Sequence, residues 1–551
     1  MQFDNFLTDT YFSSFDKRFF TGFRALRASE ETVNIIRAFL EISKEYPAEV
    51  LEEQKKLSAE LFAKLKKINF FGINIPKSYG GVGLSLFEYL KVVEAVASSS
   101  LSIGFTALAH LSIGVKGIVL FGNDEQKEKY LPPAAKGDLI FAYALTEPNI
   151  GSDAQHIETM AALSEDGRHY ILNGQKTYIT NANYAGAMTV FAQMDPKRPG
   201  FMGAFIIETA WDGVSIGKEM PKMGLKASST ATVGLDNVKV PKENLLGQAG
   251  DGFKIAMTIL NYGRLALGAA SSGIMEQSLA DMRKRSFSRK QFGAPINQYD
   301  LIQEKLVAAR VNQYVAESIT AFTAGMLDAD PLAPVAVESS HCKLFGTTRA
   351  WQTLYDALQV AGGSGYLSTQ PYEQRMRDFR VTTIFEGTTE IHSIYPALFM
   401  LRKMNSLMKT ATSVKLSTVL FLAKILFRKN PFSLSFKQKQ MRRAARTAAG
   451  IGRSIRILMI VGIFLYRRDI IHHQFFLRRI TNLSLYFYGI LSMLARIHNS
   501  LMTGEDVTKD LTLLSLFTEK AQRFKKQNGR FLSYKQDRLI KTVFNELTPV
   551  A

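Results

Sequence analysis

The hydrophobic pattern of this 551-residue chain changes twice, and the two changes restrict the folds it can adopt. Residues 41–140 and 251–405 carry apolar side chains at helical spacing, whereas residues 141–250 carry short, alternating, β-branched runs between turn signals. We therefore expect an α+β, mostly α chain: an N-terminal helical domain, a middle β domain and a four-helix bundle. Within the bundle, long helices are predicted at Phe253–Arg285, Leu301–Met326 and Val335–Ala361, and within the β domain turns are predicted at Glu165–Gly167 and Asn173–Gly174.

Two terminal segments complete the predicted organisation. Residues 1–40 are rich in phenylalanine, and we interpret them as an N-terminal extension that packs onto the body of the protein. Residues 406–551 are predicted to form an extra, basic, helical C-terminal domain. Residues 401–551 hold 28 basic and 7 acidic side chains, whereas residues 1–400 hold 40 basic and 42 acidic ones. The net charge of +19 therefore comes from the C-terminal region, where a partner that needs positive charge should bind.

The C-terminal region combines these cations with apolar runs of 10 to 12 residues. None of the runs reaches the roughly 20 residues that cross a bilayer, so we expect this region to lie on an anionic membrane surface. A solvated helical cap on a dimer is one alternative. Binding of nucleic acid is another, although the apolar content argues against it, because a nucleic-acid groove needs mainly charged and polar side chains. The apolar runs are Leu416–Phe427, Ile457–Tyr466 and Leu483–Leu494, and the basic stretch between them holds Arg442, Arg443, Arg446, Arg453 and Arg456.

The cysteine content and the first residues of the chain indicate the cellular compartment in which the protein is expected to lie. The single cysteine, Cys342, excludes an internal disulfide and fits a reducing compartment, and no zinc-ligand spacing is found. The amino terminus carries Asp4 and Asp9 and no basic residue before Lys17, which is unlike a secretory signal or an arginine-rich transit peptide. We expect a cytoplasmic protein without a metal, peripherally associated with the inner face of the cell membrane.

A candidate catalytic carboxylate lies in the stretch Ile384–His392, which reads IFEGTTEIH. The apolar run before Glu386 and the Gly-Thr-Thr after it predict that an extended segment ends there and that a helix begins with Thr388 or Thr389 as its cap. A carboxylate buried beside a flat apolar ligand has a raised pKa and can remove a proton from a weak carbon acid. The alternative is a solvated glutamate near a helix start, where the helix dipole favours a negative charge.

Three other motifs suit a flat ligand with a phosphate group. Tyr143–Ala154 (YALTEPNIGSDA) and Lys176–Thr180 (KTYIT) place hydroxyl groups beside glycine or an aromatic ring, so that Thr146 or Thr180 can donate to ring nitrogens. Arg289–Gly293 (RKQFG) joins a pyrophosphate-binding arginine to an aromatic ring. Ordinary turns and a solvated helix end are the alternatives.

Two glycines in the first helical region suggest that another group comes close to the helix backbone there. In Leu111–Phe121, Gly114 and Gly117 lie three residues apart on one predicted helix face. Glycine inside a helix costs about 1 kcal/mol relative to alanine, so another requirement maintains it there. Close helix packing and an open pocket end both explain the pair.

In this order, the motifs resemble those of the acyl-CoA dehydrogenase family: TEPxxGSDA, K-x-[WY]-I-T-N, R-x-x-FG, Q-x-x-GG-x-G-[YF] and [YF]-EGT, over residues 40–400. The very-long-chain branch is indicated by SIGVKGIVLFG at Ser112–Gly122, LNYGR at Leu260–Arg264, FGAPINQYDLIQEKLV at Phe292–Val307 and the C-terminal extension. Long-chain members are similarly membrane-associated through that extension.

The resemblance implies FAD as the cofactor, a homodimer, and a long-chain acyl-CoA as substrate. The implied FAD-binding residues are Tyr143, Leu145, Thr146, Gly151, Ser152, Tyr178, Ile179, Thr180, Arg289, Phe292, Gln359, Gly362, Gly363, Thr388 and Glu390, with Gln359, Gly362 and Gly363 acting across a subunit contact. The implied substrate-side residues are Ser152, Asn261, Arg264, Gly387, Gly114, Gly117 and Gly263, the three last-named leaving room for an acyl tail.

The resemblance also implies a chemistry. Glu386 takes the α-proton of the thioester, the β-hydride goes to flavin N5, and a trans-2-enoyl-CoA forms. The Glu386 N–H and a flavin ribityl hydroxyl stabilise the enolate, and an electron-transfer flavoprotein receives the electrons. Some members place the base just before the arginine that matches Arg264, a position that Gly263 occupies here. Many relatives have tryptophan at Tyr178, which puts the partner and oxygen reactivity in doubt. Two other readings are a DNA-associated flavoprotein and a non-catalytic assembly factor of the same fold.

Overall fold

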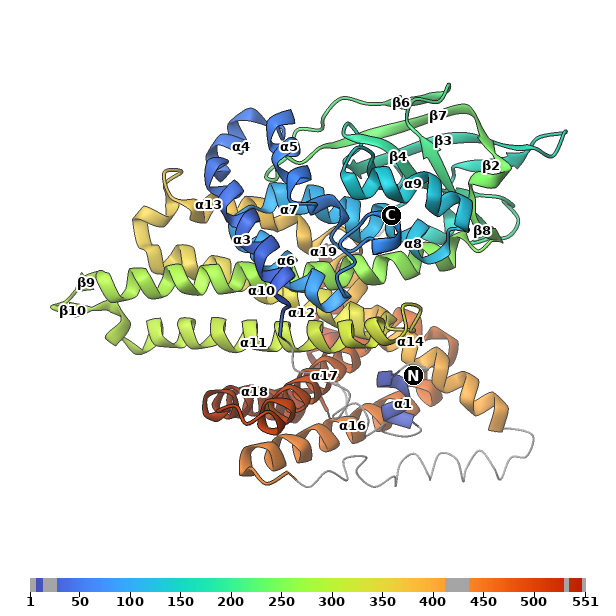
Figure 1. Ribbon diagram of the computed structural model, residues 1–551. Helices are drawn as coiled ribbons and strands as arrows, with labels where there is room; N and C mark the ends of the chain where they lie inside the picture. Colours follow the sequence, from blue (N-terminus) through green and yellow to red (C-terminus); the bar gives the residue numbers. More distant parts are fainter. Residues whose placement is uncertain (1–5, 13–26, 412–435, 530–534, 548–551) are drawn as a thin grey trace. The chain divides into compact units, whose positions relative to one another are not determined.

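The computed structural model describes residues 6–12, 27–411, 436–529 and 535–547, which form two compact units (Figure 1). The first unit extends to Thr389 and contains two helical regions and the β sheet. The second contains helix α1 (Phe6–Phe12) and the chain from Glu390 onward. The N-terminal extension therefore contributes a helix to the C-terminal unit, where the sequence had indicated only packing onto the body.

The N-terminal helical region begins eleven residues earlier than predicted, at Glu30 rather than at residue 41. Helix α3 starts at Glu30 because the Ser29 side chain accepts a hydrogen bond from the Thr32 N–H, so the predicted boundary at residue 40 falls inside a helix. Capping boxes at Ser85–Glu88 and Asn123–Gln126 start two later helices. The region consists of α3 (Glu30–Glu45), α4 (Ala48–Gln54), α5 (Ala59–Lys67), α6 (Leu86–Ser99), α7 (Leu101–Leu108), a π-helical turn η3 (Ala109–Gly114), α8 (Lys116–Phe121) and α9 (Asp124–Lys136).

The π-helical turn changes the interpretation of the glycine pair. Gly114 is the last residue of this turn and Gly117 lies in α8, so the two do not share one regular helix face as predicted. A Cβ on Gly114 would lie 2.9 Å from the Phe141 carbonyl oxygen, and one on Gly117 would lie 3.0 Å from the side chains of Ile259 and Leu246. Close packing accounts for both glycines.

The middle region is the predicted β domain. Its eight-stranded sheet has the order β6-β7-β3-β2-β4-β5-β8, and β1 pairs with β4 in parallel. Asn173 and Gly174 lie inside β3 at a register shift rather than in a turn, because Gly174 approaches the Thr159 side chain. The strands are β1 (Ile140–Ala144), β2 (Met160–Leu163), β3 (His169–Thr180), β4 (Ala185–Gln193), β5 (Met202–Glu208), β6 (Val214–Ile216), β7 (Thr230–Pro241) and β8 (Leu245–Gly250).

Three long helices follow the sheet and confirm the predicted segments: α10 (Gly252–Ser288), α11 (Asp300–Ala329) and α12 (Ala336–Ala361). Helix α10 packs against α11, α12 and α6. The short hairpin β9 (Lys290–Gln291) and β10 (Ala294–Pro295) joins α10 to α11, at the end of α10 farthest from the sheet (Figure 1). Helix α13 (Pro371–Phe379), between the 3₁₀ turns η7 (Gly362–Tyr366) and η8 (Arg380–Thr383), leads towards Glu386.

The C-terminal unit is helical, as predicted, and has its own core. It contains α14 (Thr389–Ala411), whose first residue closes the first unit, followed by α16 (Lys439–Tyr466), α17 (Gln474–Met502), α18 (Thr508–Asn528) and α19 (Lys535–Leu547). Helices α16, α17 and α18 pack on one another. Helix α1 joins them through Tyr11, whose hydroxyl donates to the Ser484 Oγ over 3.0 Å and whose ring lies 4.9 Å from that of Phe487. The predicted boundary at residue 405 falls inside α14, and the apolar run Leu416–Phe427 lies outside the described residues.

Three helical stretches are long and apolar enough to cross a membrane by length and composition: Leu101–Phe121, Lys439–Tyr466 and Gln474–Met502. The expectation that nothing in the C-terminal region reaches this length was wrong, because it considered only uninterrupted apolar runs. Packing inside the protein buries 83% and 89% of the most apolar windows of the first and third stretches, but only 50% of that of α16. Phe464 and Leu465, near the end of α16, are each 58% exposed.

The contact between α6 and α10 yields a test of the fold. A Cβ on Gly273 would lie 2.0 Å from the backbone oxygen of Glu94, so Gly273→Ala must move two helices apart, and we expect it to lower the free energy of unfolding by more than about 2 kcal/mol. Gly325→Ala on α11 is the matched control, because nothing lies within 4 Å of its Cβ, and it should stabilise by up to about 1 kcal/mol. Urea denaturation of both variants measures the difference. Equal stabilities would contradict the close approach.

Candidate active site

Glu386 lies in a tight turn between η8 and α14. The segment before it is 3₁₀-helical, not extended as predicted. Glu386 has φ +54° and Gly387 has φ +98°, so two successive residues adopt the left-handed conformation. For a residue with a side chain this conformation costs of order 1 kcal/mol, and such strain is typical of functional sites. Helix α14 begins at Thr389, as expected, and the Thr389 hydroxyl donates to the Thr383 carbonyl oxygen over 3.2 Å.

The turn directs the Glu386 carboxyl group onto helix α10 at Gly263. A Cβ at Gly263 would lie 2.7 Å from both carboxyl oxygens, so only glycine leaves space for the carboxyl group there. The Glu386 Oε2 atom is fully buried. Burial raises the pKa of Glu386 to about 7, although the charges of Arg264 and Lys343 act in the opposite direction. The carboxyl group can therefore accept or release a proton near neutral pH.

Lys343 of α12 holds the turn that carries Glu386, and the sequence analysis missed it. Its side chain is fully buried, and its ammonium group donates a hydrogen bond to the carbonyl oxygen of Gly387. A buried cation that binds the backbone next to Glu386 fixes the turn and limits the rise of the Glu386 pKa. A single lysine within a helical pattern gives no local signal of this role.

The predicted substrate-side residues of α10 gather around the same carboxyl group. Asn261 and Arg264 are both buried, and the Asn261 Oδ1 accepts hydrogen bonds from Arg264 Nη1 at 3.4 Å and from Ser339 Oγ at 2.8 Å. Tyr143 of β1 donates to the Ala256 carbonyl oxygen over 3.3 Å, and burial, reinforced by the Glu386 charge, raises its pKa. The structure thus brings Asn261, Gly263, Arg264, Tyr143, Glu386 and Gly387 together.

The two predicted cofactor motifs of the β domain contact each other. The Thr177 N–H donates to the Thr146 carbonyl oxygen over 2.9 Å, which joins the loop after β1 to the end of β3. Tyr178 has φ +57° and is 68% exposed, so its ring stands out from the sheet, whereas Ile179 is buried in the domain core and offers only its backbone. Thr180 is half-buried, and Gly151 and Ser152 are exposed.

A buried ion pair, also missed from the sequence, fastens these motifs together. Lys176 Nζ lies 2.6 Å from Glu147 Oε1 and 3.3 Å from the carbonyl oxygen of Leu145. The Glu147 carboxylate also accepts the N–H groups of Glu158 and Thr159. Burial alone would raise the pKa of Glu147, but the charge of Lys176 and these donors outweigh it and lower that pKa. Burial lowers the pKa of Lys176 to about 8.

The remaining predicted cofactor residues lie elsewhere. Arg289, the residue after α10, and Phe292 in the β9–β10 hairpin are exposed, and Phe292 is 96% exposed with φ +51°. The third group, Gln359, Gly362 and Gly363, is exposed at the end of α12, and nothing lies within 4 Å of a Cβ on either glycine. Arg289 follows Arg264 by 25 residues, or about 37 Å along a helix axis. One chain therefore does not bring both sets of predicted residues to one cofactor.

Two predicted residues remain to be placed. Thr388 is half-buried directly before α14 in the first unit, whereas Glu390 is exposed and belongs to the C-terminal unit. Their role as a cofactor wall stays a prediction.

Known proteins share this chain's whole domain order. Residues 28–138, 142–238 and 250–395 match the N-terminal, middle and C-terminal domains, respectively, of acyl-CoA dehydrogenases. The mitochondrial very long-chain specific acyl-CoA dehydrogenase of Homo sapiens is 34% identical over 522 residues, which cover 88% of this chain and 78% of that protein.

The chain belongs to the acyl-CoA dehydrogenase family.

Solved structures agree with this assignment. An acyl-CoA dehydrogenase complexed with FAD from Bacillus anthracis has a TM-score of 0.82 at 28% identity and covers 100% of this chain and 96% of its own. Butyryl-CoA dehydrogenase from Megasphaera elsdenii has a TM-score of 0.64 at 32% identity and covers 68% of this chain and 99% of its own. The fold is thus the acyl-CoA dehydrogenase fold with an additional C-terminal helical region.

The protein is an FAD-dependent oxidoreductase of this family, and its residues fit the cofactor. The exposed Tyr178 ring offers an aromatic face to a flavin, and the half-buried hydroxyl of Thr180 lies two residues away on the same strand. The open space around Gly151 lets the backbone approach a bound group, and Arg289 with Phe292 offers a cation and a ring for pyrophosphate and adenine. Among the described residues no cluster of side chains suits a metal ion.

The buried ion pair gives a testable prediction. Lys176→Met leaves the Glu147 carboxylate buried without its cation, and we expect the free energy of unfolding of the middle domain to fall by about 3–5 kcal/mol, with loss of bound FAD. Adding Glu147→Leu should restore most of the stability. The exposed pair Lys44–Glu41 provides the control, since Lys44→Met should change stability by less than about 1 kcal/mol. A double variant no more stable than Lys176→Met would show that something else fastens the two motifs.

The raised pKa of Glu386 gives a prediction about pH. Its folded-state value of about 7 exceeds the ordinary value of 4.5, so between these pH values the folded state binds more protons and loses stability as pH rises. Glu386→Gln has no such loss. We expect the free energy of unfolding of the variant to rise by up to about 3 kcal/mol relative to that of the parent between pH 4.5 and 8. Denaturation of both proteins at a fixed FAD concentration over this pH range measures the difference. A difference that stays constant with pH would show an ordinary, solvated carboxylate.

Proposed function

We propose that this enzyme dehydrogenates long-chain or very-long-chain acyl-CoA at the α and β carbons, giving trans-2-enoyl-CoA, the first step of fatty acid β-oxidation. The observation that carries the proposal is the Glu386 carboxyl group, enclosed against Gly263 with a pKa of about 7. An α-hydrogen beside a thioester is a weak acid, so its removal needs a base whose pKa is close to the working pH.

The chain's own residues supply binding, orientation and proton transfer. Glu386 accepts the α-proton, and its backbone N–H is the proposed donor to the thioester oxygen, where negative charge develops. Lys343 keeps the turn in place through the Gly387 carbonyl, so that both groups of Glu386 stay oriented. Bound FAD supplies the acceptor for the β-hydride.

The preference for long chains rests mainly on the similarity to the relatives. Human very long-chain specific acyl-CoA dehydrogenase matches most of this chain. Gly263 gives no separate support, because the Glu386 carboxyl group itself occupies the space beside it. Gly114 and Gly117 give weaker support, because close packing already accounts for them.

A homodimer is supported by the separation of the two predicted cofactor sets. Arg289 lies about 37 Å along the α10 axis from Arg264. Arg289, Phe292 and the glycines after Gln359 nevertheless carry the positive charge, the ring and the open backbone that a dinucleotide needs. We propose that a second copy of the chain brings its own set to the flavin edge of the first, which completes each site.

Two partners belong to the proposal. Reduced flavin has to be reoxidised, and an electron-transfer flavoprotein is the proposed acceptor; the exposed Tyr178 ring is a candidate contact. We also propose peripheral association with the inner face of the cell membrane through the C-terminal unit. Its charge, together with Phe464 and Leu465 exposed on α16, supports this.

A substrate series tests the reaction. The purified holoprotein is mixed with acyl-CoA thioesters from butyryl to stearoyl and a dye acceptor, and we expect the highest kcat/KM with the long chains. Glu386→Gln should keep its flavin but lose about 100- to 10,000-fold in the rate of flavin bleaching by palmitoyl-CoA. Glu165→Gln, an exposed carboxylate in a turn, should match the parent. Bleaching of Glu386→Gln at the parent's rate would refute the mechanism, and absence of turnover by the parent would favour a non-catalytic role.

A further inference from the structure

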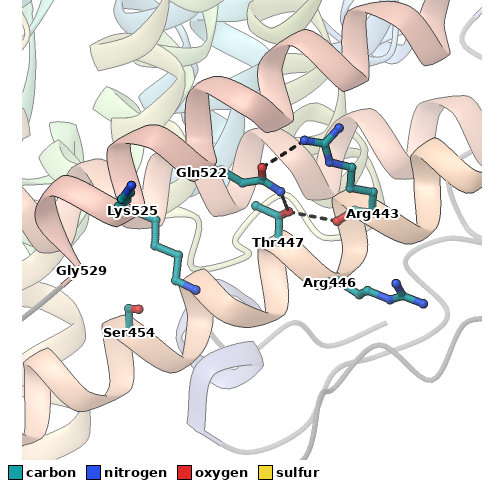
Figure 2. A pocket seen from close by; sticks show the side chains of 8 residues that line it. Arg443, Arg446, Thr447, Ser454, Gln522, Lys525 and Gly529 are labelled. Carbon is teal, nitrogen blue, oxygen red and sulfur yellow. Dashed lines mark hydrogen bonds between the residues drawn. The ribbon is translucent and has the colours of Figure 1, made fainter.

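A cleft in the C-terminal unit has no role in the proposed dehydrogenation. It is an open cleft between α16 and α18 with a volume of about 660 Å³, a size typical of small-molecule sites (Figure 2). Its lining is polar and basic. The residues used below are Arg443, Arg446, Thr447 and Ser454 from α16, and Gln522 and Lys525 from α18.

Lys525 provides the central positive charge of the cleft. Its side chain reaches from α18 towards α16, where a Cβ on Gly450 would lie 2.5 Å from its Nζ atom (Figure 2). Burial, followed by the charge of Arg453, lowers the pKa of Lys525. Among the described residues, no carboxylate lies within ion-pair distance of Lys525 or Arg446, and Glu519 accompanies Arg443 only at 3.5 Å. The cleft therefore concentrates positive charge that acidic side chains do not balance.

Hydrogen bonds fix the polar wall of the cleft before any ligand arrives. Gln522 Nε2 donates to Thr447 Oγ1 at 2.8 Å, and Arg443 Nη2 donates to Gln522 Oε1 at 3.3 Å. The Thr447 hydroxyl donates to the Arg443 carbonyl oxygen over 3.0 Å (Figure 2). Because these side chains are already ordered, binding of an anion requires little further loss of conformational entropy.

We propose that this cleft is a binding site for a phosphate group, held by Lys525 and Arg443. The Ser454 hydroxyl, which donates to the Gly450 carbonyl oxygen over 3.2 Å, can donate to the phosphate only if it rotates away from that carbonyl. A phosphate carries the charge and the several acceptor oxygens that an ammonium and a guanidinium group can satisfy together. The phosphate belongs either to a lipid headgroup or to a soluble phosphate compound. The site is independent of Glu386, so the proposal stands apart from the dehydrogenase reaction.

The decisive variant moves the lysine without changing the charge. Gly450→Ala places a methyl group against the Lys525 ammonium, while alanine also favours the helix, so a loss of binding cannot come from unfolding. Lys525→Gln removes the charge itself. Lys509→Gln is the matched control, because Lys509 is an exposed lysine of the same helix outside the cleft. The full-length holoprotein is titrated with inorganic pyrophosphate by calorimetry, and with phosphatidylcholine vesicles that contain phosphatidic acid or an equal charge of phosphatidylglycerol.

We expect Lys525→Gln and Gly450→Ala to weaken binding about tenfold or more while Lys509→Gln binds like the parent. Effects on pyrophosphate identify a soluble source, whereas effects confined to phosphatidic acid vesicles identify a lipid headgroup. Equal binding by all three variants, or equal losses in all three, would overturn the proposal and leave only general electrostatic attraction. Absence of binding to every probe would overturn it as well.

Discussion

The enclosure of one carboxyl group, that of Glu386, against a helix backbone is the constraint on which the candidate active site depends. A carboxylate loses solvation when it is buried, and Glu386 is held in that position by a left-handed turn and by the glycine opposite it. The cations Arg264 and Lys343 limit the cost, so the pKa settles near neutrality. Glutamate side chains are usually exposed to solvent, but Glu386 is held in a buried position where it can accept or release a proton near neutral pH.

Helix α10 makes this arrangement possible because every part of the first unit contacts it. The N-terminal helical region meets it through α6, the sheet through β5 and β8, and the bundle through α11 and α12. Small residues at Gly263 and Gly273 let other backbones and side chains come close. The buried pair Glu147–Lys176 then fastens the loop after β1 to strand β3 beside Tyr178, so this edge of the β domain joins residues 29 positions apart in the sequence.

The C-terminal unit differs from the first unit in its separate core and in its excess of positive charge. Its helices α16 to α18 form a separate core, joined by α1 from the other end of the chain. Residues 401–551 hold 28 basic and only 7 acidic side chains, so the net positive charge of the protein comes from this region. Part of that charge is exposed on helix surfaces, and part is gathered in a cleft with an ordered polar wall. The first kind suits general attraction to an anionic surface, and the second suits a defined anionic group.

The sequence by itself determined the order of the domains, the long helices of the bundle and the β domain, and it singled out Glu386 as a candidate base. These features could be predicted because periodicity and local motifs depend on residues that are close together in the sequence. It misplaced the boundaries at residues 40 and 405, since a helix cap and a continuous helix override a change of composition. Only the tertiary structure showed that Gly263 faces the Glu386 carboxyl group, that Lys343 holds the next carbonyl, and that Lys176 pairs with Glu147. Each of these contacts joins residues more than 25 positions apart, and the burial that sets their pKa values exists only after the chain has folded.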